Sequence, residues 1–330
     1  MRSPSRRSVV CCAALAALAA GAAACGSQDE EETTPAALAM PTAKAQDFPS
    51  TTGRSLADLQ SMIPEGPVLS PTVSLVERGT SRVGFGLFDT ARKQLGGAPV
   101  ALYLSRTDGS SLRGPFPARS ESLTVKPQFR SRQTAQDPDA ANHVYVADLA
   151  FPSRGSWAVT AVARLDGRLV RTSPTAMRVG RTGSGPPQVG DRAPRVHTPT
   201  FEDVAGDLES IDTRVPPLRS LHDTDLADVL GKEPVVLVFA TPQLCQSRVC
   251  GPVVDVAAQV QQRAGDDVRF VHMEIYRDND LSKGFRPQVA AYRLPTEPWT
   301  FVIDRRGIVR ERFEGAFSVA ELERAVERVR

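Results

Sequence analysis

The sequence predicts a multi-domain protein in which an all-β sandwich is followed by an α/β domain. Over residues 66–180, apolar residues alternate with polar or small ones, which is the period of half-buried strands. Residues 189–330 instead alternate continuous apolar runs with segments of helical period, as α/β domains do. A Gly/Pro-rich stretch at 181–188 separates the two patterns and predicts a linker. With 330 residues and 41% hydrophobic content, the chain is long enough for two packed cores.

Residues 1–25 have the features of a signal peptide. Three arginines form a basic start, and the Ala/Leu run that follows is too short to predict a spanning helix. The run ends in Ala22-Ala-Ala-Cys25, which resembles the lipobox of bacterial lipoproteins, although that family usually has a branched residue where Ala22 stands. The resemblance implies that Cys25 carries a lipid and that the protein sits on the extracytoplasmic face of the bacterial cell membrane. An ordinary cleaved signal and an uncleaved anchor are the alternatives.

Residues 26–65 are rich in Ser, Thr, Ala, Pro and Glu and lack a long apolar period, so they predict a disordered tether. The formal charge of the whole chain is +2, and removal of the leader's three arginines brings the mature chain to about −1. This charge argues against a nucleic-acid partner.

Within residues 66–180, the alternating segments predict short strands joined by turns, and therefore a β-sandwich. Asp166-Gly167 predicts a tight hairpin. The Gly155-Ser-Trp157-Ala-Val159 strand resembles those of immunoglobulin-like modules of bacterial surface proteins, which implies a spacer or a binding module. The predicted strands centre on Val83–Leu87, Val100–Leu104, Val144–Leu149, Gly155–Arg164 and Arg168–Val170.

Within residues 189–330, the element order predicted is β-α-β-(α)-β-β-α. Val235–Ala240 is a continuous apolar run, as expected for a central strand that is covered on both faces. Ser318 and Glu321 form a capping box at the start of the last helix. The remaining elements predicted are a helix at Asp223–Leu230, a helix opening at Pro252, strands at Val268–Tyr276, Trp299–Ile303 and Ile308–Phe313, and a turn at Asp304–Gly307.

Three motifs in this region resemble the thioredoxin fold, in its TlpA-like and peroxiredoxin-like branches. They are the opening Val189-Gly-Asp-Arg-Ala-Pro194, the strand–cysteine–helix unit around residues 235–252, and Glu297-Pro298-Trp-Thr-Phe-Val-Ile-Asp304. The resemblance covers 189–330. It implies that Pro298 has a cis peptide bond and packs against redox cysteines, with Pro295 as the second choice for that position.

Cys245 and Cys250 are the candidate catalytic residues. They form a C-x4-C pair between an apolar strand and a helix start, where free backbone N–H groups stabilise a thiolate. In an exported chain such a close pair is expected to form a disulfide. Cys250 is the expected nucleophile because it is nearer the helix start, and the opposite assignment, with Cys245 attacking, stays open. Peroxiredoxins need the motif Thr-x-x-Cys to prepare the attacking thiolate. Here three residues separate Thr241 from Cys245 instead of two, which disfavours a peroxidase.

The resemblance implies a thiol–disulfide oxidoreductase without a cofactor, whose partners are exported protein thiols or disulfides and a membrane redox partner. Thioredoxins carry a buried acid on the central strand, which Val235–Phe239 lacks. His272 and Glu274 alternate on the next strand and are candidates for a proton relay. Two alternatives remain. One is a copper-binding module similar to the Sco proteins, with Cys245, Cys250 and His272 as ligands, and the other is a non-catalytic domain with a structural disulfide.

Overall fold

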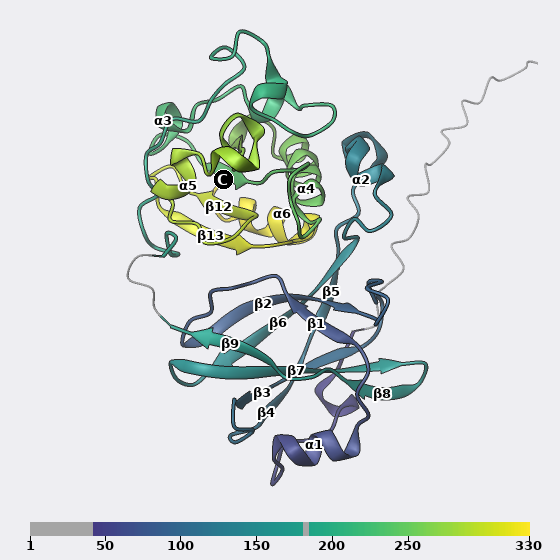
Figure 1. The fold of residues 1–330 in the computed structure, drawn as a ribbon. Helices are drawn as coiled ribbons and strands as arrows, with labels where there is room; N and C mark the ends of the chain where they lie inside the picture. Colours follow the sequence, from purple (N-terminus) through teal and green to yellow (C-terminus); the bar gives the residue numbers. More distant parts are fainter. Residues whose placement is uncertain (1–41, 181–184) are drawn as a thin grey trace, which may run out of the picture. The chain divides into compact units, whose positions relative to one another are not determined.

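The structure is a computed structural model that describes residues 42–180 and 185–330 (Figure 1). The predicted leader, the lipid attachment at Cys25 and the first part of the predicted tether lie outside these residues. In the ranges 42–180 and 185–330, no helix is both long and apolar enough to cross a membrane.

Two antiparallel sheets form the N-terminal part, in the orders β1-β2-β6-β5 and β4-β3-β7-β8, with β9 also paired to β7. One apolar core joins residues from both sheets, among them Phe85, Leu102, Tyr145 and Trp157, so the two sheets form a sandwich. Its likeness to immunoglobulin modules stays a prediction. The strands are β1 (Val68–Pro71), β2 (Gly79–Phe88), β3 (Val100–Arg106), β4 (Arg113–Pro117), β5 (Arg119–Ser122), β6 (His143–Phe151), β7 (Gly155–Leu165), β8 (Arg168–Arg171) and β9 (Thr175–Val179).

The hairpin between β7 and β8 turns at Asp166 and Gly167 as predicted. Leu165 faces Arg168 in the register, and both turn residues have positive φ, at 48° and 77°. This is the two-residue loop that Asp-Gly favours.

Residues 42–65 differ from the prediction of a tether. They contain a 3-10 turn, η1 (Ala45–Asp47), and a helix, α1 (Leu56–Met62), which Ser55 and Asp58 cap reciprocally. Leu59 and Ile63 from this segment are buried in a cluster with Tyr103 and Val162 of the sandwich. The outer faces of β3 and β7 are apolar and need a cover, and a seven-residue helix is too short to produce a clear helical period in the sequence.

In the C-terminal part, the sheet order is β11-β10-β12-β13. Strand β10 is parallel to β11 and antiparallel to β12, and β13 is antiparallel to β12. With helices in the order found here, this is the topology of a thioredoxin-like domain. The elements are α3 (Leu226–Val229), β10 (Val235–Phe239), α4 (Cys250–Ala264), β11 (Arg269–Met273), α5 (Pro287–Ala291), β12 (Trp299–Ile303), β13 (Val309–Glu314) and α6 (Val319–Glu327), with 3-10 turns η3 (Leu208–Ser210), η4 (Arg219–Leu221), η5 (Gly265–Asp267), η6 (Arg277–Asn279) and η7 (Leu281–Lys283).

Two predicted elements are shorter in the structure. The helix expected from Asp223 begins only at Leu226, because the Asp225 side chain accepts from the Ala227 N–H and so caps the helix there. The strand expected to reach Tyr276 ends at Met273. Beyond it, Glu274 accepts hydrogen bonds from Thr213, which lies outside the sheet.

A buried ion pair fixes helix α4 against two irregular segments. Arg214 Nε donates to Asp255 of α4 at 3.0 Å, and the Ser131 N–H and hydroxyl each donate to the same carboxylate at 3.0 Å. Ser131 lies between η2 (Pro127–Phe129) and α2 (Arg132–Gln136), in the connection from β5 to β6. Arg214 also donates to the carbonyls of Phe129 and Pro216, so each of its three guanidinium nitrogens donates one hydrogen bond.

Candidate active site

The two cysteines lie between the end of β10 and the start of α4. The apolar run that forms β10 is buried throughout, and the loop after it leads to Cys250, the first residue of α4. Pro252 lies in the first helical turn, where its missing N–H costs no intrahelical hydrogen bond. Arg248 adopts a positive φ of 56° and donates to Asp137 and Asp139 at 2.9 and 2.7 Å, which holds the loop.

Both cysteines are free thiols in the structure. Cys250 is fully buried, whereas Cys245 is partly exposed and lies 3.2 Å (Sγ to Oγ) from Ser247. The two Sγ atoms and a carboxylate oxygen of Glu297 all lie within 4.8 Å of one another. We call these three residues, Cys245, Cys250 and Glu297, the cysteine site. The predicted disulfide stays a prediction.

The acidity of the thiols is opposite to the prediction. A hydrogen bond from the Cys250 thiol, with others from Ser247 and the backbone N–H groups of Cys250 and Val249, lowers the pKa of Cys245 to about 6 against the effect of burial. Burial, followed by its interactions with Cys245, raises the pKa of Cys250 well above its usual value. Cys250 is at the helix start as predicted, but the free backbone N–H groups there donate to the sulfur of Cys245.

Glu297 belongs to the site, although it had not been predicted as a site residue. It directly precedes Pro298, and the bond between them is cis, as the resemblance implied. Burial, with a smaller contribution from the nearby Cys245, raises the pKa of Glu297 to about 7. An acid that titrates near neutral pH beside a thiol of similar pKa can accept or donate a proton during thiol chemistry. The only sequence signal for it was its place next to Pro298.

Glu274 connects to the cysteine loop through Thr213. One oxygen of Glu274 accepts from the Thr213 N–H and hydroxyl at 2.8 and 2.7 Å, and the Gln243 N–H donates to the same hydroxyl oxygen at 3.2 Å. Burial raises the pKa of Glu274 to about 7.

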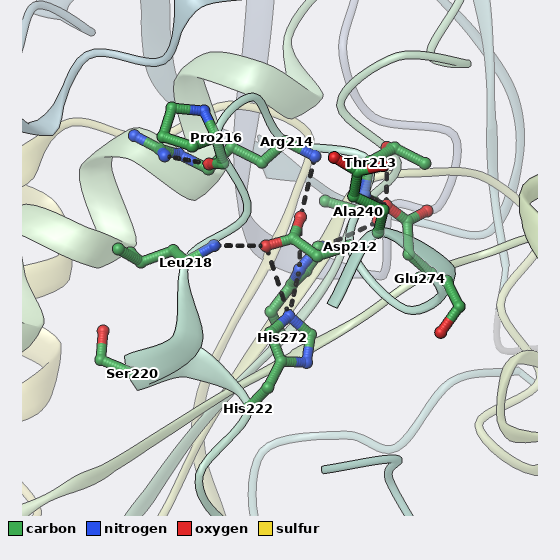
Figure 2. A network of polar contacts seen from close by, with 12 residues as sticks. Asp212, Thr213, Arg214, Pro216, Leu218, Ser220, His222, Ala240, His272 and Glu274 are labelled. Carbon is green, nitrogen blue, oxygen red and sulfur yellow. Dashed lines mark hydrogen bonds and ion pairs between the residues drawn. The ribbon is translucent and has the colours of Figure 1, made fainter. Parts of the chain in front are cut away.

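His272 does not join the cysteine site. It lies with Asp212 and His222 (Figure 2), in a group here called the Asp–His–His cluster, which shares no residue with the cysteine site. His272 Nδ1 is 3.3 Å from His222 Nε2 and 3.5 Å from Asp212 Oδ1, and His222 Nε2 is 3.5 Å from Asp212 Oδ2. The structure therefore brings Glu274 toward the cysteine loop but not His272. It does not assemble the alternative copper ligand set, since only the two cysteines of that set lie together.

The sequence could not have shown this cluster. Asp212 comes from the irregular segment after η3, His222 follows η4, and His272 lies on β11, so no fixed spacing relates the three. All three are about 1% exposed. His272 Nε2 lies 3.0 Å from the Ala240 carbonyl, and since burial lowers the pKa of this ring, a neutral imidazole donates there and leaves its Nδ1 lone pair facing the other two residues.

Comparisons with known proteins give a weak similarity to a solved structure. No family model matches the chain, and no curated protein matches it. A solved structure titled as a thiol:disulfide interchange protein of the thioredoxin family, from Chlorobium tepidum TLS, is similar at 16% identity. The match covers 46% of this chain and 99% of that one, with a TM-score of 0.26.

Proposed function

We propose that the protein is an exported, membrane-anchored thiol–disulfide oxidoreductase that acts on extracytoplasmic proteins through Cys245 and Cys250. The observation that carries this proposal is the division of properties between two adjacent thiols. Cys245 is partly exposed and has a pKa of about 6, while Cys250 is buried and close behind it. An accessible thiolate with a second thiol in reach is what disulfide exchange requires.

The reaction follows from these positions. The Cys245 thiolate attacks one sulfur of a substrate disulfide, which forms a mixed disulfide and releases the other substrate sulfur as a thiolate that takes up a proton. The Cys250 thiol then loses its proton and attacks Cys245 Sγ. This forms the Cys245–Cys250 disulfide and releases the second substrate sulfur. The protein loses two electrons and two protons, which the substrate gains, and the reverse sequence oxidises a substrate dithiol.

Glu297 is placed to accept the proton that Cys250 must lose. Its carboxylate oxygen is within 4.8 Å of both sulfurs, and a pKa of about 7 leaves it able to take a proton near neutral pH. Glu274 supports the site indirectly, since it holds Thr213, to which Gln243 of the cysteine loop donates. Pro298 follows Glu297, and the peptide bond between them is cis.

Trapping of mixed disulfides in the two single variants tests the proposal. Cys250→Ser should accumulate covalent partners through Cys245, because the attacking thiolate is retained and the resolving thiol is lost. Cys245→Ser should trap few, and the double variant is the matched control. If neither single variant traps a partner and the reduced thiols react no faster than ordinary cysteines, the pair is a structural clip and the enzyme proposal fails.

Anchorage is a separate part of the proposal and has its own test. The motif that ends at Cys25 supports lipid attachment there, so labelling with a radioactive fatty acid should be lost in Cys25→Ala. Cys12→Ala is the control, since Cys12 lies inside the leader. Labelling that survives Cys25→Ala would contradict lipid attachment at Cys25, and the proposal of thiol–disulfide exchange would not be affected.

Metal binding by the thiols is the second candidate function, because Cys245, Cys250 and Glu297 offer three ligand atoms close together. The carboxylate makes this set less suited to Cu(I), which prefers sulfur and imidazole ligands. A Cu(I) titration of the reduced protein decides between the candidates. Tight one-to-one binding that depends on both cysteines, with no trapped partners, would favour the metal function.

A further inference from the structure

The Asp–His–His cluster has the composition and spacing of a metal site. Its two ring nitrogens are 3.3 Å apart, and each is 3.5 Å from a different oxygen of Asp212, which are Oδ2 for His222 and Oδ1 for His272. These contacts are longer than the usual ~2.9 Å of a good hydrogen bond. They are close to the ligand–ligand separation of about 3.3 Å that a tetrahedral ion with bonds of about 2.0 Å imposes.

Neither a lysine nor an arginine pairs with Asp212 among the residues that the structure describes. Asp212 is buried, and among the residues that the structure describes its ion-pair partners are only the two imidazoles. The nearby guanidinium of Arg214 is bound to Asp255 and two carbonyls instead. A buried carboxylate without a cation is costly, and a bound divalent ion would compensate it.

The surroundings hold the ligand atoms in place. The backbone N–H groups of Arg214 and Leu218 donate to Asp212 at 2.8 and 2.9 Å (Figure 2). His272 donates from Nε2 to the Ala240 carbonyl, which directs the lone pair of Nδ1 into the cluster. This is the arrangement by which an outer hydrogen bond orients a metal-binding imidazole. His222 has its polar contacts through Nε2 alone, since its Nδ1 lacks a partner among the described residues.

We infer that Asp212, His222 and His272 form a binding site for a divalent transition-metal ion, with Zn²⁺ as the ion that this donor set suits best. Two imidazoles and a carboxylate are common zinc ligands. The site is buried and joins three positions that are distant in the sequence. It ties the irregular segment that carries Asp212 and His222 to strand β11. The inference is independent of the proposed thiol chemistry.

The test uses the full chain with all five cysteines replaced by Ser, so that no thiolate can bind the ion. After dialysis, elemental analysis should find one zinc per chain. Replacement of zinc by Co²⁺ should give the visible absorption bands of a tetrahedral site with nitrogen and oxygen ligands. Absence of stoichiometric zinc and of these cobalt bands would overturn the inference.

Single variants in this background locate the site. His222→Gln and His272→Gln should each weaken zinc binding by more than the ~10–100-fold that loss of an outer hydrogen-bond partner costs. His197→Gln is the matched control, because His197 is half exposed, pairs with Asp225 and lies outside the cluster. Equal binding by His222→Gln and His197→Gln would overturn the assignment. If circular dichroism shows that a variant does not fold, the cobalt spectrum of the five-serine chain decides alone.

Discussion

The cysteine site and the Asp–His–His cluster lie in the same thioredoxin-like domain, and each consists of three titratable side chains. They differ in access to solvent. Cys245 is partly exposed and its thiol is acidic, whereas all three residues of the cluster are about 1% exposed. The cysteine site has one partly exposed, acidic thiol that a partner can reach, whereas the cluster presents no side chain to solvent. This difference is why we propose thiol chemistry for the first group and ion binding for the second.

The largest effect expected from this comparison is on stability. Asp212→Ala should lower the free energy of unfolding in the presence of a chelator by about 2–4 kcal/mol, because two buried N–H groups lose their acceptor. Cys245→Ser should change it by less than about 0.5 kcal/mol. Urea denaturation measures both, and Asp223→Ala, an exposed change on the same segment, is the control. A small loss for Asp212→Ala would show that the cluster does not stabilise the fold.

The next effect is on thiol reactivity. In the folded, reduced protein, alkylation of Cys245 should rise with pH around a midpoint of about 6, because its thiolate is stabilised there. Cys250 should react slowly at every pH at which the fold persists, because it is buried and its pKa is raised. In urea, both thiols should titrate near the ordinary value of about 8.5. Mass spectrometry of the alkylated single variants separates the two, and an acidic Cys250 would reverse their roles.

The pKa of Cys245 also makes stability depend on pH. Its folded-state pKa lies below the unfolded value, so its contribution is present above about 8.5 and is lost as pH falls from there through about 6. The reduced protein should therefore lose stability over this window relative to Cys245→Ser. A flat difference between the two proteins would contradict the lowered pKa.

The smallest effect tests one hydrogen bond within the cysteine site. Ser247→Ala removes the hydroxyl that lies 3.2 Å from Cys245 Sγ, so the pKa of Cys245 should rise by about half a unit. Alkylation rate against pH measures the shift. Ser220→Ala is the control, since Ser220 pairs with Gln261 away from the thiols. An unchanged midpoint in Ser247→Ala would assign the acidity of Cys245 to the Cys250 thiol and the backbone alone.

The periodicity of the sequence predicted the strands of the C-terminal part and five strands of the sandwich, because alternation and continuous apolar runs record burial directly. Strands β1, β4, β5 and β9 were not predicted. The prediction of a disordered tether was wrong for residues 42–65. A single short helix has too few residues to show a helical period in the sequence. Cys245 and Cys250 were found because they are close in the chain. The sequence did not show which of the two thiols is more acidic, because that depends on which sulfur the backbone N–H groups at the start of α4 face. Asp212 and His222 were missed because only the fold brings them to His272.

The packing of residues 42–65 onto the sandwich affects how far the protein can work from a membrane. If Cys25 is the point of attachment, only the 16 residues between it and residue 42 separate the lipid from the folded part. Fully extended, this length of chain spans at most about 60 Å. A tether of the 40 residues predicted from composition would have allowed more than twice that distance. Under the proposed attachment at Cys25, this shorter segment limits how far the folded part can lie from the bilayer, and it would raise the effective concentration of Cys245 toward membrane-bound partners.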